Sequence, residues 1–148
     1  LLDGEEDADE DGFVDGSDTD PLDADTDDDG IDDRDEGDDF SLQPLVADTD
    51  GDGLNDGLEI GRDSLIAGGL SDIRSIPYVG TDGSWMRDQD TGTVTDPLDP
   101  DTDSDGIVDG DEDSNESGHV DATEPDPLDR DTDADAIQDG QESAPGQT

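Results

Sequence analysis

One acidic phrase recurs along the chain and places oxygen-bearing side chains at fixed intervals. Its form is Asp-x-Asp-x-Asp-Gly-x-x-Asp-x-x-Glu, so carboxylates occupy positions 1, 3, 5, 9 and 12 of a twelve-residue loop. Alternate residues of such a loop point at one centre, and glycine at position 6 permits the sharp turn between ligands. Ca²⁺ is a hard cation that takes about six to eight oxygen ligands. The spacing therefore predicts a calcium site in each copy.

Three copies follow the phrase fully, and an earlier one differs only at its last position. The three full copies supply Asp25, Asp27, Asp29, Asp33 and Glu36; Asp48, Asp50, Asp52, Asp56 and Glu59; and Asp101, Asp103, Asp105, Asp109 and Glu112. The earlier copy supplies Asp7, Asp9, Asp11, Asp15 and Asp18, with Gly12 at position 6. Position 7 adds a backbone carbonyl while its apolar side chain turns away to pack. The residues at this position are Phe13, Ile31, Leu54 and Ile107.

Two further copies are irregular. One keeps the ligand spacing with Asp131, Asp133, Asp135, Ile137, Asp139 and Glu142. Ala136 stands at its position 6, where a left-handed turn costs about 1 kcal/mol or more, so we expect a weaker site. The other copy is interpreted as a loop widened by two residues, with the His119 carbonyl facing the ion. Its ligands are Asp111, Asp113, Asn115, His119, Asp121 and Glu124.

A second phrase, Asp-Pro-Leu-Asp, precedes three of the loops. Proline fixes its own φ and favours extended geometry in the residue before it, so each phrase should form a stiff connector that places its leucine against the adjoining loop. The two aspartates of each connector could share an ion with that loop. These aspartates are Asp20 and Asp23, Asp96 and Asp99, and Asp126 and Asp129.

The alternation of the two phrases over residues 3–59 and 95–142 resembles the thrombospondin type 3 repeat, in the cysteine-free form of secreted and surface-anchored bacterial proteins. The resemblance implies a chain wrapped around several calcium ions, about six or more, with almost no regular helix or strand. It implies an extracellular or cell-surface spacer or stalk, and it carries over Asp25, Asp27, Asp29, Asp33, Glu36 and their counterparts as ligands. Because this chain has no cysteine, its rigidity should depend more heavily on metal.

Composition points to the same class of fold. The 148 residues include 50 acidic and only five basic ones, giving a formal net charge of −45, and 25% of them are hydrophobic. Such a chain cannot bury one large core, so we expect a loop-dominated, elongated array that expands when metal is absent. The acidic surface would repel nucleic acid, and no apolar run approaches the roughly 18 residues of a membrane span.

Residues 60–94 interrupt the acidic pattern and divide the chain into repeats at 1–59, a middle segment at 60–94 and repeats at 95–148. The apolar spacing of residues 65–76 is compatible with a short amphipathic helix, although Gly68 and Gly69 weaken that interpretation. The middle segment is either a partner surface, since Tyr, Trp and Arg favour interfaces, or a local hydrophobic anchor for neighbouring repeats.

These patterns predict a binding protein and no enzyme. The only histidine, His119, lacks a nucleophile beside it, and paired carboxylates without a packed cleft do not make a glycosidase. Asn115 begins a glycosylation sequence but also fills a ligand position, and we favour the ligand. The first hypothesis is an extracellular calcium-dependent structural module; the alternative is a calcium-dependent self-assembling filament or adhesin subunit that uses residues 60–94 as its interface.

Overall fold

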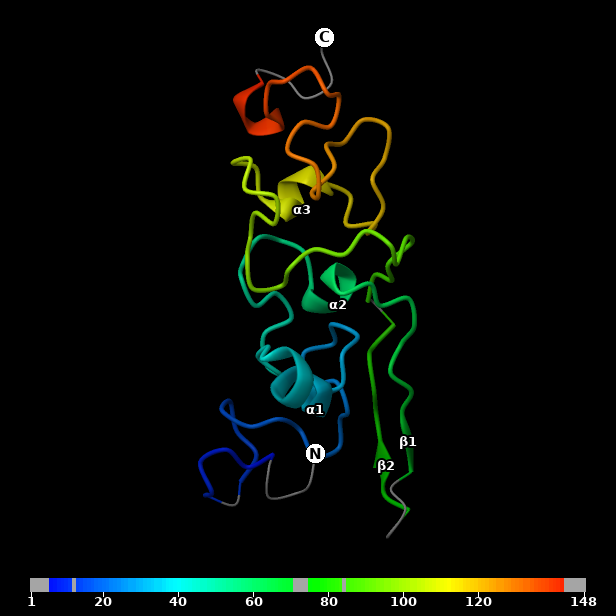
Figure 1. The fold of residues 1–148 in the computed structure, drawn as a ribbon. Helices are drawn as coiled ribbons and strands as arrows, with labels where there is room; N and C mark the ends of the chain where they lie inside the picture. The colour runs from blue at the N-terminus through cyan, green and yellow to red at the C-terminus, as the bar shows by residue number, and fades with distance from the viewer. Residues whose placement is uncertain (1–5, 12, 71–74, 84, 143–148) are drawn as a thin grey trace. The chain divides into compact units, whose positions relative to one another are not determined.

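The computed structural model describes residues 6–11, 13–70, 75–83 and 85–142. Over these residues the chain is mostly irregular, as expected from the sequence, with a few very short helices and one two-stranded sheet (Figure 1). The helical elements are α1 (Asp33–Asp35), the π-helix η1 (Glu36–Phe40), α2 (Asp56–Glu59), α3 (Asp109–Glu112) and the 3₁₀-helix η2 (Asp139–Gln141). The strands are β1 (Gly69–Leu70) and β2 (Pro77–Tyr78).

The helical turns arise from the second half of the acidic phrase. Each of α1, α2, α3 and η2 begins at the aspartate in position 9 of a loop. Residues three apart on a helix share one face, so a single turn brings the carboxylates of positions 9 and 12 to the same side. Each of these four helical turns therefore serves to converge two candidate ligands.

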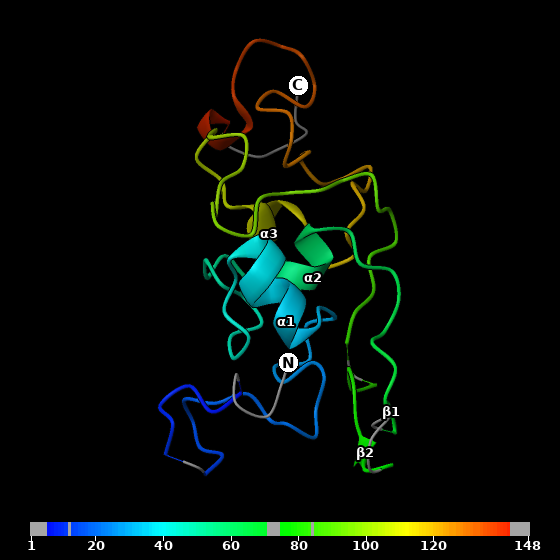
Figure 2. The ribbon, with the colours of Figure 1, turned by 60° about the horizontal axis from the view of Figure 1, so that its bottom comes forward.

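The chain divides into two compact units, which are described separately. One contains Leu1–Ala47 with Ser64–Trp85, and the other contains Asp48–Asp63 with Met86–Thr148. Residues 60–94 thus contribute to both units. Within the second unit, α2 and α3 lie close together in both views (Figures 1 and 2), although they are separated in sequence by the whole middle segment.

Acidic side chains occupy positions that a hydrophobic core would normally fill. Among the described residues, the buried apolar side chains are Ile31, Leu42, Leu54 and Leu58. The largest fully buried side chains are otherwise carboxylates, namely Glu36, Glu59, Glu112, Asp25, Asp29, Asp56 and Asp109. Buried carboxylates are costly unless a compensating charge or proton accompanies them.

The helix considered for residues 65–76 is wrong for the part that the structure describes, because residues 65–68 are irregular and 69–70 form β1, which pairs antiparallel with β2. The two strands appear as adjacent arrows in Figure 2. A Cβ on Gly68 would lie 2.8 Å from the Tyr78 carbonyl oxygen, so the glycines permit a close pairing of the two segments. Ile73 and Arg74 lie outside the described residues.

The middle segment also joins the first repeats by backbone pairing. Val79 donates its N–H to the Leu22 carbonyl at 2.8 Å, and Ala24 donates to the Val79 carbonyl at 3.2 Å. These bonds fix the chain after β2 beside the connector that precedes the Asp25 loop. Within the described residues, none of the helices has the length and apolar character required to cross a bilayer.

Candidate metal centres

The Asp101 loop shows how backbone N–H groups orient the first three aspartates. Asp101 accepts from Asp105 N and Gly106 N, each at 3.1 Å. Asp103 Oδ1 accepts from Asp105 N at 3.0 Å, and Asp105 Oδ1 accepts from Ile107 N at 2.8 Å. Each bond holds one oxygen of a carboxylate close to its own loop. The Asp131 loop repeats all four bonds.

The Asp25 and Asp48 loops follow the same scheme with small changes. Asp25 accepts from the N–H groups of positions 5 and 6, at 3.1 Å each. Asp48 accepts from Gly51 at position 4 and from Gly53 at position 6. One carboxylate oxygen from each of positions 1, 3 and 5 lies within 4.8 Å of the others in both loops. The structure therefore brings these predicted ligands together.

A threonine at position 2 orients the aspartate at position 9. Thr102 donates both its N–H, at 2.9 Å, and its hydroxyl, at 2.6 Å, to the Asp109 carboxylate. The same double contact joins Thr26 to Asp33, Thr49 to Asp56, and Thr132 to Asp139. In the recurrent Asp-Thr-Asp sequence, the threonine thus orients a candidate ligand but is not itself a candidate ligand. The sequence alone did not indicate this role.

The position 12 glutamates of the three full copies are buried, and most of their carboxylate oxygens lack a hydrogen-bond donor among the described residues. Neither carboxylate oxygen of Glu36 or of Glu112 has a hydrogen-bond partner among the described residues, and both side chains are 0% exposed. Glu59 Oε1 accepts from the Thr95 hydroxyl at 3.0 Å, whereas its Oε2 has no donor there. At position 3, Asp50 Oδ2 and Asp103 Oδ2 are likewise buried without a donor. Orphaned oxygens of this kind fit a hard divalent cation.

Electrostatics single out the same glutamates. Burial raises the pKa of Glu36 to about 10, and repulsion from Asp27, Asp29 and other loop carboxylates adds to the effect. Burial with neighbouring carboxylates raises the pKa of Glu59 to about 9 and that of Glu112 to about 8. A cation would reverse this cost because it supplies the positive charge that the loops otherwise lack.

The loops share two left-handed backbone positions, of which the sequence analysis recognised one. Position 6 has a positive φ at Gly30, Gly53, Gly106, Gly118 and Ala136, and Gly12 lies outside the described residues. Position 4 also has a positive φ, at Glu10, Asp28, Gly51, Ser104, Glu116 and Ala134. Ala136 adopts the expected turn with φ at 76°, so the loop keeps its shape in spite of the strain.

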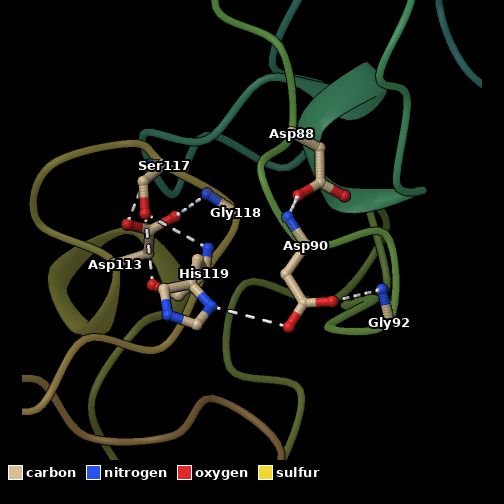
Figure 3. Close-up of polar contacts among 7 residues, drawn as sticks. All are labelled: Asp88, Asp90, Gly92, Asp113, Ser117, Gly118 and His119. Atoms are coloured by element: carbon tan, nitrogen blue, oxygen red, sulfur yellow. Dashed lines mark hydrogen bonds and ion pairs between the residues drawn. The ribbon is translucent and has the colours of Figure 1, made fainter.

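The fifth loop has a different register from the one inferred from the sequence (Figure 3). Asp113, and not Asp111, makes the bonds of position 1: it accepts from Ser117 N at 3.0 Å and from Gly118 N at 2.7 Å. Glu116 and Gly118 then have the positive φ of positions 4 and 6. This register needs no widening, because it places Asn115 at 3, Ser117 at 5, His119 at 7, Asp121 at 9 and Glu124 at 12. Ser117 is a candidate ligand that the sequence reading missed.

Asn115 and His119 have specific partners in this loop. Asn115 donates its amide to Asp121 at 3.0 Å and to Glu124 at 2.9 Å, while Glu124 Oε2 is buried without a donor among the described residues. The His119 ring nitrogen Nδ1 lies 3.5 Å from Asp90 Oδ2, outside the loop (Figure 3). The ring therefore faces away from the candidate ligands, as the sequence interpretation required.

The first loop departs most from the scheme. Asp7 and Asp9 both accept from Asp11 N, at 3.0 and 3.1 Å, as in the other loops. Asp18 accepts from Ala8 N at 2.8 Å and from Asp15 N at 3.1 Å, so the residue at position 12 makes the contact that position 9 makes elsewhere. Asp15 is exposed and caps its own turn through Ser17.

Packing at position 7 and in the connectors is only partial. Ile31 and Leu54 are buried, but Phe13 is 74% exposed, so the expectation that these side chains pack is wrong for the first loop. Ile137, at the same position of the Asp131 loop, is 47% exposed. The connector leucines are about half exposed too. The first aspartate of each connector uses Oδ1 to accept from the leucine N–H two residues later, and its own N–H contacts the position 2 threonine of the next loop.

No protein-family model, curated protein or solved structure matches this chain. The assignment of its candidate sites therefore rests on the residues and their geometry.

Proposed function

We propose that this chain is an extracellular calcium-binding structural module in which six loops each hold one Ca²⁺ and stack into a stiff spacer or stalk, as in the thrombospondin type 3 repeats that its sequence resembles. The observation that carries the proposal is the set of buried position 12 glutamates, Glu36, Glu59 and Glu112: among the described residues, both oxygens of Glu36 and Glu112 and Oε2 of Glu59 lack a hydrogen-bond donor. Each ion would offset two units of the formal net charge of −45 and provide the missing partner for these oxygens.

Contacts between loops of the second unit support the stacking. Asp52 Oδ2, at position 5 of one loop, accepts from Gly110 N of another at 2.8 Å. Asp105 Oδ2 makes the equivalent bond to Gly140 N of the Asp131 loop. Position 5 of one loop thus contacts position 10 of another in two pairs of loops, and both acceptors belong to candidate ligands. Ordering one loop by calcium would help to order its neighbour.

Calcium titration tests the proposal directly. Calorimetry on the metal-free chain should give about six ions, and circular dichroism and protease resistance should change with the same stoichiometry. At free calcium about 100 times a site's Kd, each site would stabilise the folded form by about 2.7 kcal/mol. Asp105→Ala with Glu112→Ala should remove about one ion, whereas Asp63→Ala, an exposed acid outside the loops, should remove none. Unchanged stoichiometry in the double variant would contradict the ligand assignment.

A second candidate is a calcium-dependent filament or adhesin subunit that uses residues 60–94 as an interface. Exposed apolar side chains in that segment favour it: Leu65 is 52%, Leu70 60% and Val79 59% exposed. Sedimentation with and without chelator separates the two candidates. A monomeric spacer changes its frictional ratio at constant mass, whereas a polymer changes its mass.

A further inference from the structure

A stretch from the middle segment, residues 79–83 with Trp85, covers the Asp25 loop within the first unit. Thr81 donates its hydroxyl to Asp25 Oδ2, an oxygen of the predicted ligand at position 1. The same hydroxyl accepts the Ile66 N–H at 2.9 Å. Because Ile66 occupies the acceptor side of the hydroxyl, the hydroxyl proton is directed towards the carboxylate. Thr81 is therefore held in place to orient one candidate ligand.

Trp85 closes the outer side of the same loop. Its indole N–H donates to the Asp29 carbonyl at 2.6 Å. The ring lies over Gly30, where a Cβ would meet Trp85 Cε2 and Cζ2 at 2.6 Å. Asp82 adds a backbone N–H to Asp28 Oδ1 at 2.6 Å. The consecutive loop residues Asp28, Asp29 and Gly30 are thus covered by one stretch that is remote in sequence. The candidate ligands Asp25, Asp29 and Glu36 of this loop are all 0% exposed.

The equivalent glycines of two other loops have no such cover. At Gly53 and at Gly106, a Cβ would meet nothing within 4 Å. Both glycines are exposed, whereas Gly30 is buried. Gly118 of the fifth loop is buried like Gly30, and a Cβ there would meet the Asp88 carboxylate. The feature that distinguishes the Asp25 loop is the complete burial of its ligands at positions 1 and 5, because Asp25 and Asp29 are both 0% exposed, whereas Asp48 and Asp101 are only partly buried.

We infer that Thr81 and Trp85 are positioning residues for the ion of the Asp25 loop, and that they make this ion the slowest to leave. The inference rests on the calcium-binding function proposed above. Release of a buried ion requires water to replace its protein ligands, and water reaches this loop only after the indole and the Thr81 hydroxyl move away. In the Asp48, Asp101 and Asp131 loops the aspartate at position 1 is only partly buried, and in the Asp113 loop Asn115 and Asp121 are exposed. Water therefore reaches at least one candidate ligand of each of these loops without displacing a remote segment.

Stopped-flow mixing of the calcium-loaded chain with a fluorescent calcium chelator tests the inference. We expect a slow phase with the amplitude of one ion, accompanied at the same rate by a change in the fluorescence of Trp85, the only tryptophan. Thr81→Val should accelerate this phase about tenfold, the loss expected for one hydrogen bond to a charged group, without changing the number of ions bound. Thr81→Ser, which keeps the hydroxyl, should restore the slow rate.

Thr91→Val is the matched control, because Thr91 is an exposed threonine of the middle segment that lies in the other unit. It should leave every phase unchanged. A slow phase that Thr81→Val does not accelerate, or release of all ions at one rate, would overturn the inference while leaving calcium binding intact. Failure to bind calcium at all would instead overturn the proposed function.

Discussion

The Asp25 and Asp131 loops are built from the same hydrogen bonds but differ sharply in burial. Both orient position 1 through the N–H groups of positions 5 and 6, and both hold position 9 through a threonine. Ile31 is 0% exposed in the first loop, whereas Ile137, its counterpart, is 47% exposed. Twelve local residues are thus sufficient to shape a candidate site. Protection from water comes from elsewhere in the chain.

The largest expected effect is a pH dependence of stability in the metal-free protein, which should be stronger for the Asp25 loop than for the Asp131 loop. The raised pKa of Glu36, about 10, means that the folded form retains a proton that the unfolded chain loses above its ordinary pKa of 4.5. Stability of the metal-free fold must therefore fall as pH rises between these values. Glu59 and Glu112 act in the same direction, with pKa values raised to about 9 and about 8.

Hydrogen exchange on calcium-free protein at pH 5 and pH 9 measures this effect. We expect the amides of residues 25–36 to lose far more protection between the two pH values than those of residues 131–142. Calcium addition near pH 7 should release protons, which a weakly buffered titration detects, because the ion replaces them. Protection that rises with pH in the absence of metal would contradict the assignment of these buried glutamates.

Replacing the glutamate at position 12 tests the effect of the difference in burial between the two loops. In calcium, Glu36→Gln should lower the free energy of unfolding by about 3 kcal/mol or more, since it removes a buried charge from a compensated site. Without calcium the same change should be stabilising near pH 7, because the folded form no longer has to take up a proton that the unfolded chain has lost. Glu142→Gln should show the same signs with smaller amplitudes. Denaturant unfolding gives the change in free energy of unfolding for each of the two variants, with calcium and with chelator. Equal changes in the two loops would show that the difference in burial has no effect on stability.

Adding a methyl group at position 6 tests the cover over the Asp25 loop. Gly30→Ala forces a Cβ against the Trp85 ring as well as into a left-handed conformation, so we expect a loss of about 2–3 kcal/mol. Gly106→Ala has the same backbone strain but open space around it, so about 1 kcal/mol should be lost. Thermal unfolding in calcium compares the two variants. Equal losses would show that Trp85 contributes nothing at this position.

The smallest expected effect is a gain in the exposed loop. Ala136 has φ at 76°, and Ala136→Gly should recover about 1 kcal/mol of backbone strain. Calcium affinity of the Asp131 loop should rise by up to about tenfold, measured by calorimetry in a variant background that lacks the Asp25 site. A lower affinity would mean that the greater flexibility of glycine in the unfolded loop costs more free energy than the relief of backbone strain at position 6 recovers.

The sequence contained enough to predict the loop-dominated fold and the convergence of positions 1, 3 and 5, because both depend on short-range spacing. The register of the fifth loop was also encoded: Gly118 lies five residues after Asp113, as Gly106 does after Asp101. The left-handed position 4 was not recognisable, since Asp28, Ser104 and Ala134 share no residue type. The roles of Thr81 and Trp85 depend on contacts across more than 50 residues, for which a single sequence gives no spacing signal.

The hydrogen bond from Asp88 N to the Arg62 carbonyl, at 2.9 Å, has a consequence for how such a chain can diversify. It ties together the two points at which residues 64–85 leave and rejoin the second unit. A different insert between these points would leave this closure of the second unit in place. Because Thr81 and Trp85 of the present insert cover the Asp25 loop within the first unit, replacing the insert would change how far water reaches the candidate ligands there while every ligand stays the same.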